Sequence, residues 1–293
     1  MSKKKFNGME RSESTDELNN KIFSLRCAVD ANEALAHLSL TDALLERALW
    51  ARNCSVADAE AVLVAYCHWY LKTLGDAKAR MGIHNVHAFL LTGILQIPGW
   101  QDADGQPVLL VLPNRYCPAK IPERHIVNAL MYMLECLTTK DQRAKRHGIT
   151  ILCDMTGWGW ENFSMGSASR ILQVLSYSFP VRIRKIVLMN APEIFTQIVW
   201  TMITPMMSLD LAERFVFHTY DTILELFEED QLLAELGGTR EHVAMETFVQ
   251  ARYRSEGLPF SPISLATVNW QEDMDDITRN NSINSLHRRK EAL

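Results

Sequence analysis

Three features that would point to common protein classes are missing from the 293-residue sequence: cysteine pairs spaced Cys-x-x-Cys, an excess of positive charge, and an apolar run long enough to cross a bilayer. The first absence argues against a structural zinc site, and we expect the six cysteines to be reduced. A net charge of −5 argues against nucleic acid as a main partner, because neutralising phosphates takes a concentrated basic surface. The most apolar stretch, residues 193–209, is too short and too interrupted to span a membrane.

Targeting signals are also missing. Residues 1–20 are polar and charged, without the apolar core of a signal peptide, position 2 is not glycine, and the last residues form no prenylation motif. We therefore expect a cytoplasmic protein. Because residues 1–20 and 256–293 show little hydrophobic periodicity, we expect a disordered tail over the first range and a flexible tail over the second.

Between these tails, the pattern of apolar residues changes from helical to mixed. Thr41 and Ser55 are placed to cap two helices, and we expect the second to end at Gly75. From about residue 93, β-branched runs alternate with helical stretches, which predicts an α/β fold, a sheet with crossover helices. Asp102-Ala-Asp-Gly105 predicts a hairpin-type connection. The predicted strands are 94–97, 108–112, 149–153 and 185–189, and the helices between the later strands are 122–137 and 164–178.

Gly157-x-Gly159 follows the third predicted strand, as a dinucleotide-binding turn would. Asn162 stands where that motif has its third glycine, and Trp158 and Trp160 flank the second. Backbone amides must approach a pyrophosphate closely, and two indole rings would crowd that approach. We therefore reject nucleotide binding at this turn.

Other chemistries have little support in the sequence. Cys67, His68, His84 and His87 could be drawn together as a zinc site, but they lack the paired spacings that structural zinc sites favour. Ser167 lies outside a Gly-x-Ser-x-Gly nucleophile elbow, and no His-Cys phosphatase signature is present. We therefore expect no enzymatic activity and no metal.

Six short motifs occur in an order that is informative when they are taken together. They are Arg47-Ala-Leu-Trp-Ala-Arg52, Asp104-Gly-Gln-Pro107, Asp154-x-x-Gly157-Trp158, Tyr177-Ser-Phe-Pro180, Asn190-Ala-Pro192 and Glu235-Leu-Gly-Gly238. With these motifs the sequence resembles the CRAL-TRIO (Sec14-like) lipid-binding family over about residues 35–245. Within the family it is most similar to the branch that contains the tocopherol-transfer protein, the clavesins and the lipid-binding half of one tyrosine phosphatase.

The resemblance implies a particular organisation. A small N-terminal helical unit would occupy residues 21–80 and a lipid-binding domain residues 81–255. The sheet would be mixed and mostly parallel. Helices would cover one face of it, and on the other face a mobile gate helix, residues 193–207, would close an apolar pocket.

The composition of the gate segment suits this role. Apolar residues surround most of its circumference, and only Thr196, Thr201 and Thr204 form a polar stripe. Moving a lipid through water exposes its chains at about 0.8 kcal/mol per methylene, so a carrier needs apolar walls and an apolar door. Periodicity alone does not distinguish such a pocket from a filled core.

The pocket itself is predicted from strand alternation and from the resemblance. Alternation places Ile149, Ile151 and Cys153 on one face of their strand and Ile186 and Leu188 on one face of the next. The full predicted wall is Ile149, Ile151, Cys153, Trp158, Ile171, Leu175, Phe179, Ile186 and Leu188, and the predicted gate contacts are Ile194, Phe195, Ile198, Val199 and Met202.

The resemblance also implies a basic cluster beside the gate that binds phosphoinositide headgroups. Arg184 and Arg214 stand at matching positions. Asp210 and Thr204 stand where lysines are expected, and Asp210 inverts the charge where cations should converge on phosphate. Trp50 is a further departure, at a position where the family usually has arginine.

From this resemblance we expect a monomeric, non-enzymatic lipid-binding or lipid-transfer protein, peripherally associated with intracellular membranes and acting in vesicle trafficking. The pocket would hold a phospholipid, a phosphoinositide or an isoprenoid, and no cofactor other than this bound lipid is expected. The second partner would be a membrane surface, including an anionic one, and not nucleic acid. The alternative is a protein-interaction scaffold of the same fold whose pocket is filled by side chains.

Overall fold

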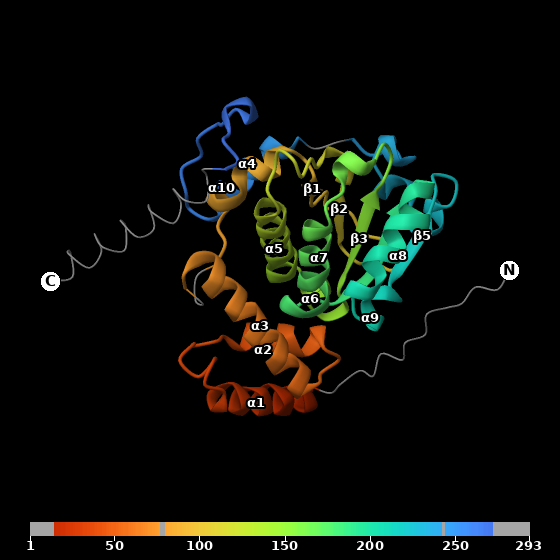
Figure 1. Ribbon diagram of the computed structural model, residues 1–293. Helices are drawn as coiled ribbons and strands as arrows, with labels where there is room; N and C mark the ends of the chain where they lie inside the picture. The colour runs from red at the N-terminus through yellow and green to blue at the C-terminus, as the bar shows by residue number, and fades with distance from the viewer. Residues whose placement is uncertain (1–14, 77–79, 242–243, 272–293) are drawn as a thin grey trace.

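The computed structural model of the 293-residue chain describes residues 15–76, 80–241 and 244–271. The first three helices lie together at one end of the molecule, and the sheet lies beyond them, behind α5 and α7 (Figure 1). The α-helices of the described residues are α1 Thr15–Ala31, α2 Asp42–Ala51, α3 Val56–Leu74, α4 Ile83–Leu91, α5 Glu123–Lys140, α6 Gln142–His147, α7 Met165–Gln173, α8 Trp200–Ile203, α9 Leu209–Ala212 and α10 Met245–Ser255.

The sheet of the described residues has five strands in the order β1-β2-β3-β4-β5. Only β1 runs antiparallel to its neighbour, so the predicted mixed, mostly parallel sheet is confirmed. The sequence did not predict β5, which pairs with β4 in register Leu188↔Phe217. The strands are β1 Leu95–Gln96, β2 Val108–Val111, β3 Ile149–Asp154, β4 Ile183–Met189 and β5 Phe215–His218.

Local side-chain chemistry begins and ends these elements as predicted. The hydroxyl of Thr41 accepts from the amide of Leu44, and the hydroxyl of Ser55 caps α3 in the same way. At the other end of α3, Gly75 adopts φ 71°, the left-handed conformation that glycine favours. In the hairpin between β1 and β2, Asp102 Oδ1 accepts from two loop amides, which confirms the predicted connection.

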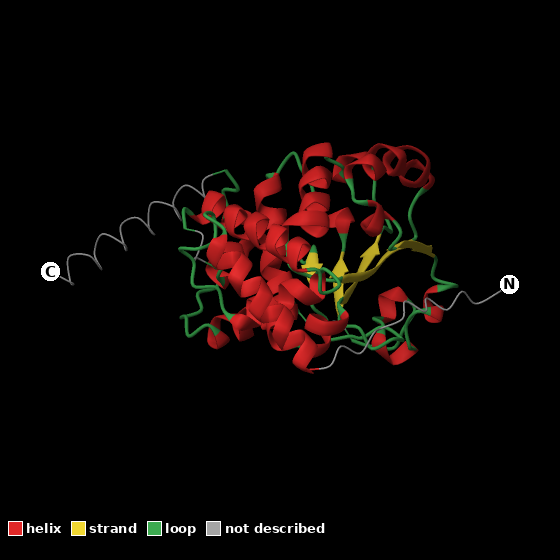
Figure 2. Ribbon diagram, turned by 90° about the horizontal axis from the view of Figure 1, so that it is seen from below, coloured by secondary structure: helices red, strands yellow, loops and turns green. Residues whose placement is uncertain are grey.

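The two faces of the sheet have different covers. Ile151 and Ile186 are paired in register and face α5, α7 and the gate segment, whereas Leu152 and Val187 face short helical turns and loops of residues 219–240. Figure 2 shows the helices gathered on one side of the strands and these turns and loops on the other. The gate therefore shares a face with α5 and α7, which corrects the expectation that it closes the opposite face.

Parts of both predicted tails lie within the described residues. Residues 15–20 belong to α1, whose Leu18 is buried, and residues 1–14 lie outside the described residues. Residues 256–271 lack periodicity but contact the rest of the chain: the ring of Phe260 lies 5.6 Å from that of His87, the ring of Trp270 lies 5.2 Å from that of His125, and the carbonyl of Trp270 accepts from Arg124 at 2.8 Å. The structure thus places residues 15–20 in a helix, whereas the flexibility of residues 256–271 stays a prediction and residues 272–293 lie outside the described residues.

Candidate functional site

The gate segment begins with a π-helical turn, Phe195–Val199, continues through α8 and ends in a 3₁₀ turn, Thr204–Met206. Its inward side consists of apolar side chains spaced four residues apart, all of which are buried: Phe195, Val199, Ile203 and Met207. π-Helical turns are rare and often occur at functional sites. The gate therefore presents one continuous apolar row to the sheet.

A second apolar row lies on the outside of the gate. Ile198 exposes 47% of its surface and Met202 exposes 41%, and Met206 and Leu209 continue the exposed row. The prediction that Ile198 and Met202 close the pocket is therefore wrong for this structure, because each follows an inward-facing neighbour by three residues and points away from the core. Phe195 and Val199 face inward as predicted, and Ile194 is half-buried against the core.

The polar stripe of the gate is satisfied within the helix. The hydroxyl of Thr196 donates to the carbonyl of Glu193, that of Thr201 to Ile198 and that of Thr204 to Trp200, over 2.6–3.0 Å. Such bonds leave no hydroxyl dependent on water. A helix that enters an apolar phase needs this, because an unsatisfied polar group there costs several kcal/mol.

The predicted wall residues belong to the large apolar cluster that also contains the inner row of the gate, but the ring of Phe179 lies 5.6 Å from that of Tyr66 on α3. Ile151 pairs in register with Ile186, and Cys153 with Leu188, so the predicted alternation of side chains is confirmed. Burial, and then the charge of Asp154, raise the pKa of the Cys153 thiol to about 12, so this side chain is neutral at pH 7. Buried members of the same cluster are Ile149, Ile151, Trp158, Leu175, Phe179, Ile186 and Leu188, and Cys153 and Ile171 are partly buried against it.

Aromatic rings join the gate to the wall. The ring of Phe195 meets that of Trp158 edge-on, with 5.4 Å between the ring centroids. The ring centroid of Trp200 lies 5.0 Å from that of Phe215 and 5.3 Å from that of Phe217, both on β5. The gate is thus closed against the sheet in this structure. The two pockets described below lie elsewhere, since no residue of the gate lines either of them.

A basic crevice lies beside the gate, where α2, β4 and α9 meet. Arg52, Arg182 and Arg214 line it together with Asp210. Asp210 accepts two hydrogen bonds of 2.7 Å from Nη2 of Arg214. Burial lowers the pKa of the Arg52 guanidinium below its ordinary value, although the nearby carboxylate of Asp210 opposes this shift. The crevice has a volume of about 20 Å³, room for about one water molecule.

This crevice changes the predicted headgroup pair. Arg214 lines it, whereas Arg184 does not, and Arg52 and Arg182 take part although neither was selected as a site residue. Arg52 is the last residue of the motif Arg47-Ala-Leu-Trp-Ala-Arg52, so the family resemblance could have identified it as a candidate site residue. At Trp50, where the family usually has arginine, the guanidinium carbon of Arg146 lies over the indole ring, 5.2 Å from its centroid.

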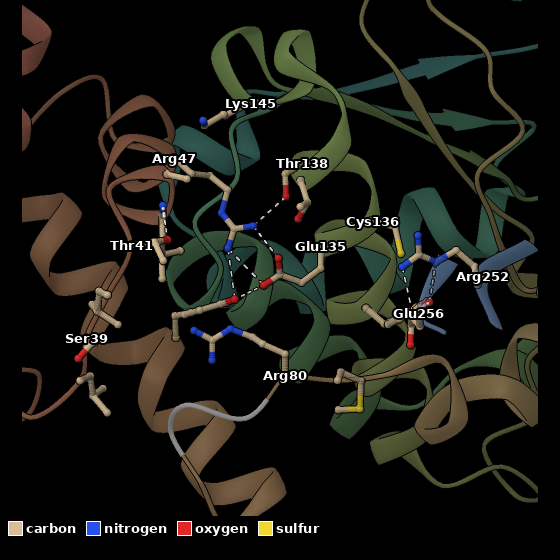
Figure 3. Close-up of a pocket in the computed structure, with 18 residues that line it drawn as sticks. Ser39, Thr41, Arg47, Arg80, Glu135, Cys136, Thr138, Lys145, Arg252 and Glu256 are labelled. Atoms are coloured by element: carbon tan, nitrogen blue, oxygen red, sulfur yellow. Dashed lines mark hydrogen bonds and ion pairs between the residues drawn. The ribbon is translucent and has the colours of Figure 1, made fainter. Parts of the chain in front are cut away.

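A second, larger pocket lies between the N-terminal helices and the rest of the chain. We call it the N-terminal cavity. It has a volume of about 560 Å³ and is bounded by α2, α3, α5 and α10 (Figure 3). Its lining includes Ser39, Thr41, Arg47, Tyr66, Arg80, Tyr132, Glu135, Lys145, Arg252 and Glu256.

The floor of the N-terminal cavity is a buried ion pair. Arg47 Nη1 donates to Glu135 Oε2 at 2.6 Å and to Thr138 at 3.1 Å, and the hydroxyl of Tyr66 donates to the same carboxylate. Burial by itself would raise the pKa of Glu135, but the charge and hydrogen bonds of Arg47 outweigh burial and hold that pKa below its usual value. The carboxylate therefore stays ionised and ties α2 to α5.

The alternative chemistries gain no support from the geometry. His87 is buried, and its Nδ1 lies 3.0 Å from the hydroxyl of Tyr253. The hydroxyl of Ser167 lies 2.9 Å from that of Tyr116, and burial raises the pKa of Tyr116, so the protonated phenol is not a base for the serine. Among the described residues no three His, Cys, Asp or Glu side chains gather as a metal site would require, and no helix is long and apolar enough to cross a membrane.

The family comparison matches about half of the chain. A family model described as the CRAL/TRIO domain matches residues 91–238. This range contains the predicted wall, the gate and β1 to β5. The crystal structure of Sfh5 has a similar fold, with a TM-score of 0.54 and 13% identity, and the similarity covers 83% of this chain and 99% of the other.

Two curated relatives agree with the family match. "Alpha-tocopherol transfer protein-like" from Mus musculus is 29% identical over 223 residues, which cover 74% of this chain and 64% of the relative. "Tyrosine-protein phosphatase non-receptor type 9" from Mus musculus is 24% identical over 174 residues, which cover 58% of this chain and 29% of that protein. The chain thus matches less than two thirds of the length of either relative.

Proposed function

The chain belongs to the CRAL/TRIO domain family, and from this premise we propose that it binds one hydrophobic molecule between the gate and the sheet and exchanges it at membranes. The two-sided gate carries this proposal. Its inner row, Phe195 to Met207, covers the apolar wall, while its outer row, Ile198 to Leu209, is exposed. A plain core helix would not need the second row.

Opening of the gate is the step on which the proposal depends. In the closed arrangement Phe195 packs on Trp158, so a ligand enters only when this contact is broken. Contact of the outer row with a bilayer offsets the lost packing, because apolar side chains that leave water gain about 25 cal/mol per Å². The membrane thereby favours the open state, and water favours the closed one.

We further propose that the basic crevice gives this exchange a preference for anionic membranes. Arg52, Arg182 and Arg214 lie beside the gate, where a lipid headgroup would be found when the acyl chains enter. Each arginine near an anionic surface contributes about 1 kcal/mol. Asp210 reduces this contribution by pairing with Arg214.

No catalytic role is proposed. The wall side chains are apolar, and the one thiol among them, Cys153, is kept protonated by burial. A nucleophile would need the opposite shift, toward the thiolate.

The test is ligand uptake. The purified full chain is incubated with liposomes of phosphatidylcholine, phosphoinositide and an isoprenoid, re-isolated and weighed by native mass spectrometry. We expect one lipid mass per chain. Ile171→Trp, at a half-buried wall position, should reduce uptake, because the indole takes the space of the ligand.

The scaffold alternative makes the opposite prediction. If the pocket is permanently filled, neither the purified chain nor the liposome-treated chain carries a lipid, and Ile171→Trp changes nothing. That outcome would refute the proposed function.

A further inference from the structure

The N-terminal cavity is separate from the gate. It lies at the junction of α2, α3, α5 and α10, and none of its lining residues belongs to the predicted pocket wall. Its volume of about 560 Å³ falls within the range of about 300–1,000 Å³ that is typical of small-molecule sites.

Hydrogen bonds hold the polar part of its lining in place. Arg47 is fixed by Glu135 on the floor, as described above. On the α10 side, Glu256 Oε1 accepts from the hydroxyl of Tyr132 at 2.6 Å and from Arg252 at 3.0 Å. Figure 3 shows these two networks on neighbouring sides of the cavity. Polar groups fixed in this way need little reorganisation when a ligand binds.

The charge of the lining favours an anion. Four basic side chains, Arg47, Arg80, Lys145 and Arg252, face two carboxylates, Glu135 and Glu256. Lys145 is also paired outside the lining, with Glu46 at 2.6 Å. The guanidinium of Arg80 lies over the rings of Tyr66 and Tyr70, at 5.1 and 4.9 Å, beside the floor.

The rest of the lining is apolar. Leu38, Leu40, Ala43, Leu44 and Met81 face the cavity from the segment before α2, from its first turn and from the approach to α4. A hydrated inorganic anion would gain nothing from this wall, whereas a hydrocarbon chain would gain about 0.8 kcal/mol per buried methylene. The lining therefore combines a cationic end with an apolar slot.

We propose that the N-terminal cavity binds an amphiphilic carboxylate with a single alkyl chain. The carboxylate meets Arg80, and the chain lies along the apolar wall formed by Leu38, Leu44 and Met81. The ligand bridges α2 and α5 and stabilises their docking. This inference does not rest on the proposed function, because the site shares no residue with the gate or the pocket wall.

The test is a titration of the full chain with decanoate by calorimetry, with decyltrimethylammonium as the chain-matched cation. We expect decanoate to bind and the cation not to bind at this site. Arg80→Gln should raise the dissociation constant about tenfold, as loss of one charge contact of about 1.4 kcal/mol does. Ala43→Trp, at an exposed position, should fill the slot and abolish binding. Arg143→Gln is the matched control, since Arg143 is exposed and does not line the cavity.

Photolabelling locates the site. A decanoate analogue with a diazirine on its chain is irradiated with the protein, and labelled peptides are mapped by mass spectrometry. Labels on peptides that contain Leu38–Leu44 or Tyr132–Thr139 support the inference. Labels confined to residues 195–207 would overturn it while leaving the proposed function intact, as would unchanged decanoate affinity in both Arg80→Gln and Ala43→Trp.

Discussion

Arg47 shows how much a single residue depends on its partner. It is 6% exposed and carries its charge into the junction of α2 and α5, where Glu135 neutralises it. Removing one member of a buried pair costs about 3–5 kcal/mol, because the remaining charge is left without compensation. We therefore expect Glu135→Gln to lower the free energy of unfolding by about 3 kcal/mol or more, as measured by urea denaturation.

The exposed pair of Arg170 and Glu123 provides the control. These side chains expose 54% and 36% of their surface at a separation of 2.6 Å, and such surface pairs contribute about 0–1 kcal/mol. Glu123→Gln should therefore change the free energy of unfolding by less than about 1 kcal/mol. Equal losses of unfolding free energy in Glu123→Gln and Glu135→Gln would show that the buried pair stabilises the fold no more than the exposed pair does.

His87 gives the fold a dependence on pH. Burial lowers the pKa of His87 below its ordinary value, with Glu246 opposing the shift, so the folded chain holds the neutral ring. Between that lowered pKa and about 6.5, the unfolded chain binds the proton and the folded chain does not. The free energy of unfolding should therefore fall as the pH falls below about 6.5. Urea denaturation at pH 7.5, 6.5 and 5.5 measures this change.

Substitution isolates the contribution of His87. His87→Gln should lose less stability between pH 7.5 and 5.5 than the parent chain does. His84→Gln, at an exposed position of the same helix, should follow the parent chain. Parallel pH profiles for the parent and His87→Gln would contradict the assignment.

Single residues of the site were predictable where a strand sets their direction. Ile151 and Ile186 follow from alternation along β3 and β4. The meeting of Arg52 with Arg182 was not predictable, because the two come together only through tertiary packing, at the end of α2 and just before β4. A basic residue in a one-dimensional pattern carries no information about which other charges it will join.

The gate element has one buried and one exposed apolar row. The outer row is expected to touch the bilayer, so Ile198→Asp with Met202→Asp should reduce vesicle binding and lipid transfer. Each aspartate that enters the apolar part of the bilayer costs about 2.5–3.5 kcal/mol. Because both side chains are largely exposed, the free energy of unfolding should change little. Vesicle co-sedimentation and a fluorescent-lipid transfer assay measure the loss.

Exposed apolar residues on the N-terminal helices serve as controls for the gate variant. Phe23 exposes 70% of its surface and Leu71 exposes 50%. Phe23→Asp with Leu71→Asp adds the same charge away from the gate and should leave transfer unchanged. If both double variants lose transfer equally, the effect reflects general surface polarity.

Element boundaries were predictable where a cap or a turn residue specifies them, as at Thr41, Ser55 and Gly75. The strand β5 was missed because Phe215–His218 is short and lies at the sheet edge. Four residues are too few for an alternating apolar pattern to be recognised. The orientation of the gate was also not predictable. An almost uniformly apolar helix has no polar face to fix which row turns inward.

At the scale of the whole molecule, Ser208 and Asp210 line the basic crevice on either side of the exposed Leu209, so we expect the outer gate row and the crevice to meet one membrane together. Asp210 neutralises part of that surface through Arg214. Asp210→Asn should therefore tighten binding to phosphoinositide-containing vesicles about fivefold, because one charge at an anionic surface is worth about 1 kcal/mol. Co-sedimentation at 0.1 M salt measures the change.

The control for Asp210 makes the same change of charge on another side. Asp230 is exposed and lies among the turns that cover the opposite face of the sheet. Asp230→Asn should leave vesicle binding within about twofold of the parent chain. Equal gains in the two variants would point to net charge rather than to the crevice.

The overall architecture was the most predictable level, because six ordered motifs and a run of alternating strands specify it together. The covering of the sheet was not. The acidic amphipathic segment 219–240 forms short turns rather than a long helix, and its Ile223, Phe227 and Leu232 are buried on the far face. The boundaries at residues 80 and 255 remain predictions, as does the monomeric state.

Glu256 has a consequence for the smallest fragment that can fold alone. Its carboxylate accepts hydrogen bonds from the amide of Ile83 at 2.8 Å, from the hydroxyl of Tyr132 and from the guanidinium of Arg252. It therefore links α4, α5 and α10. An excised piece limited to the family-matched residues 91–238 would leave the Tyr132 hydroxyl without its acceptor and would omit both other donors. The autonomous folding unit therefore extends on both sides of the recognised domain, and recombinant work on lipid uptake should begin from the longer polypeptide.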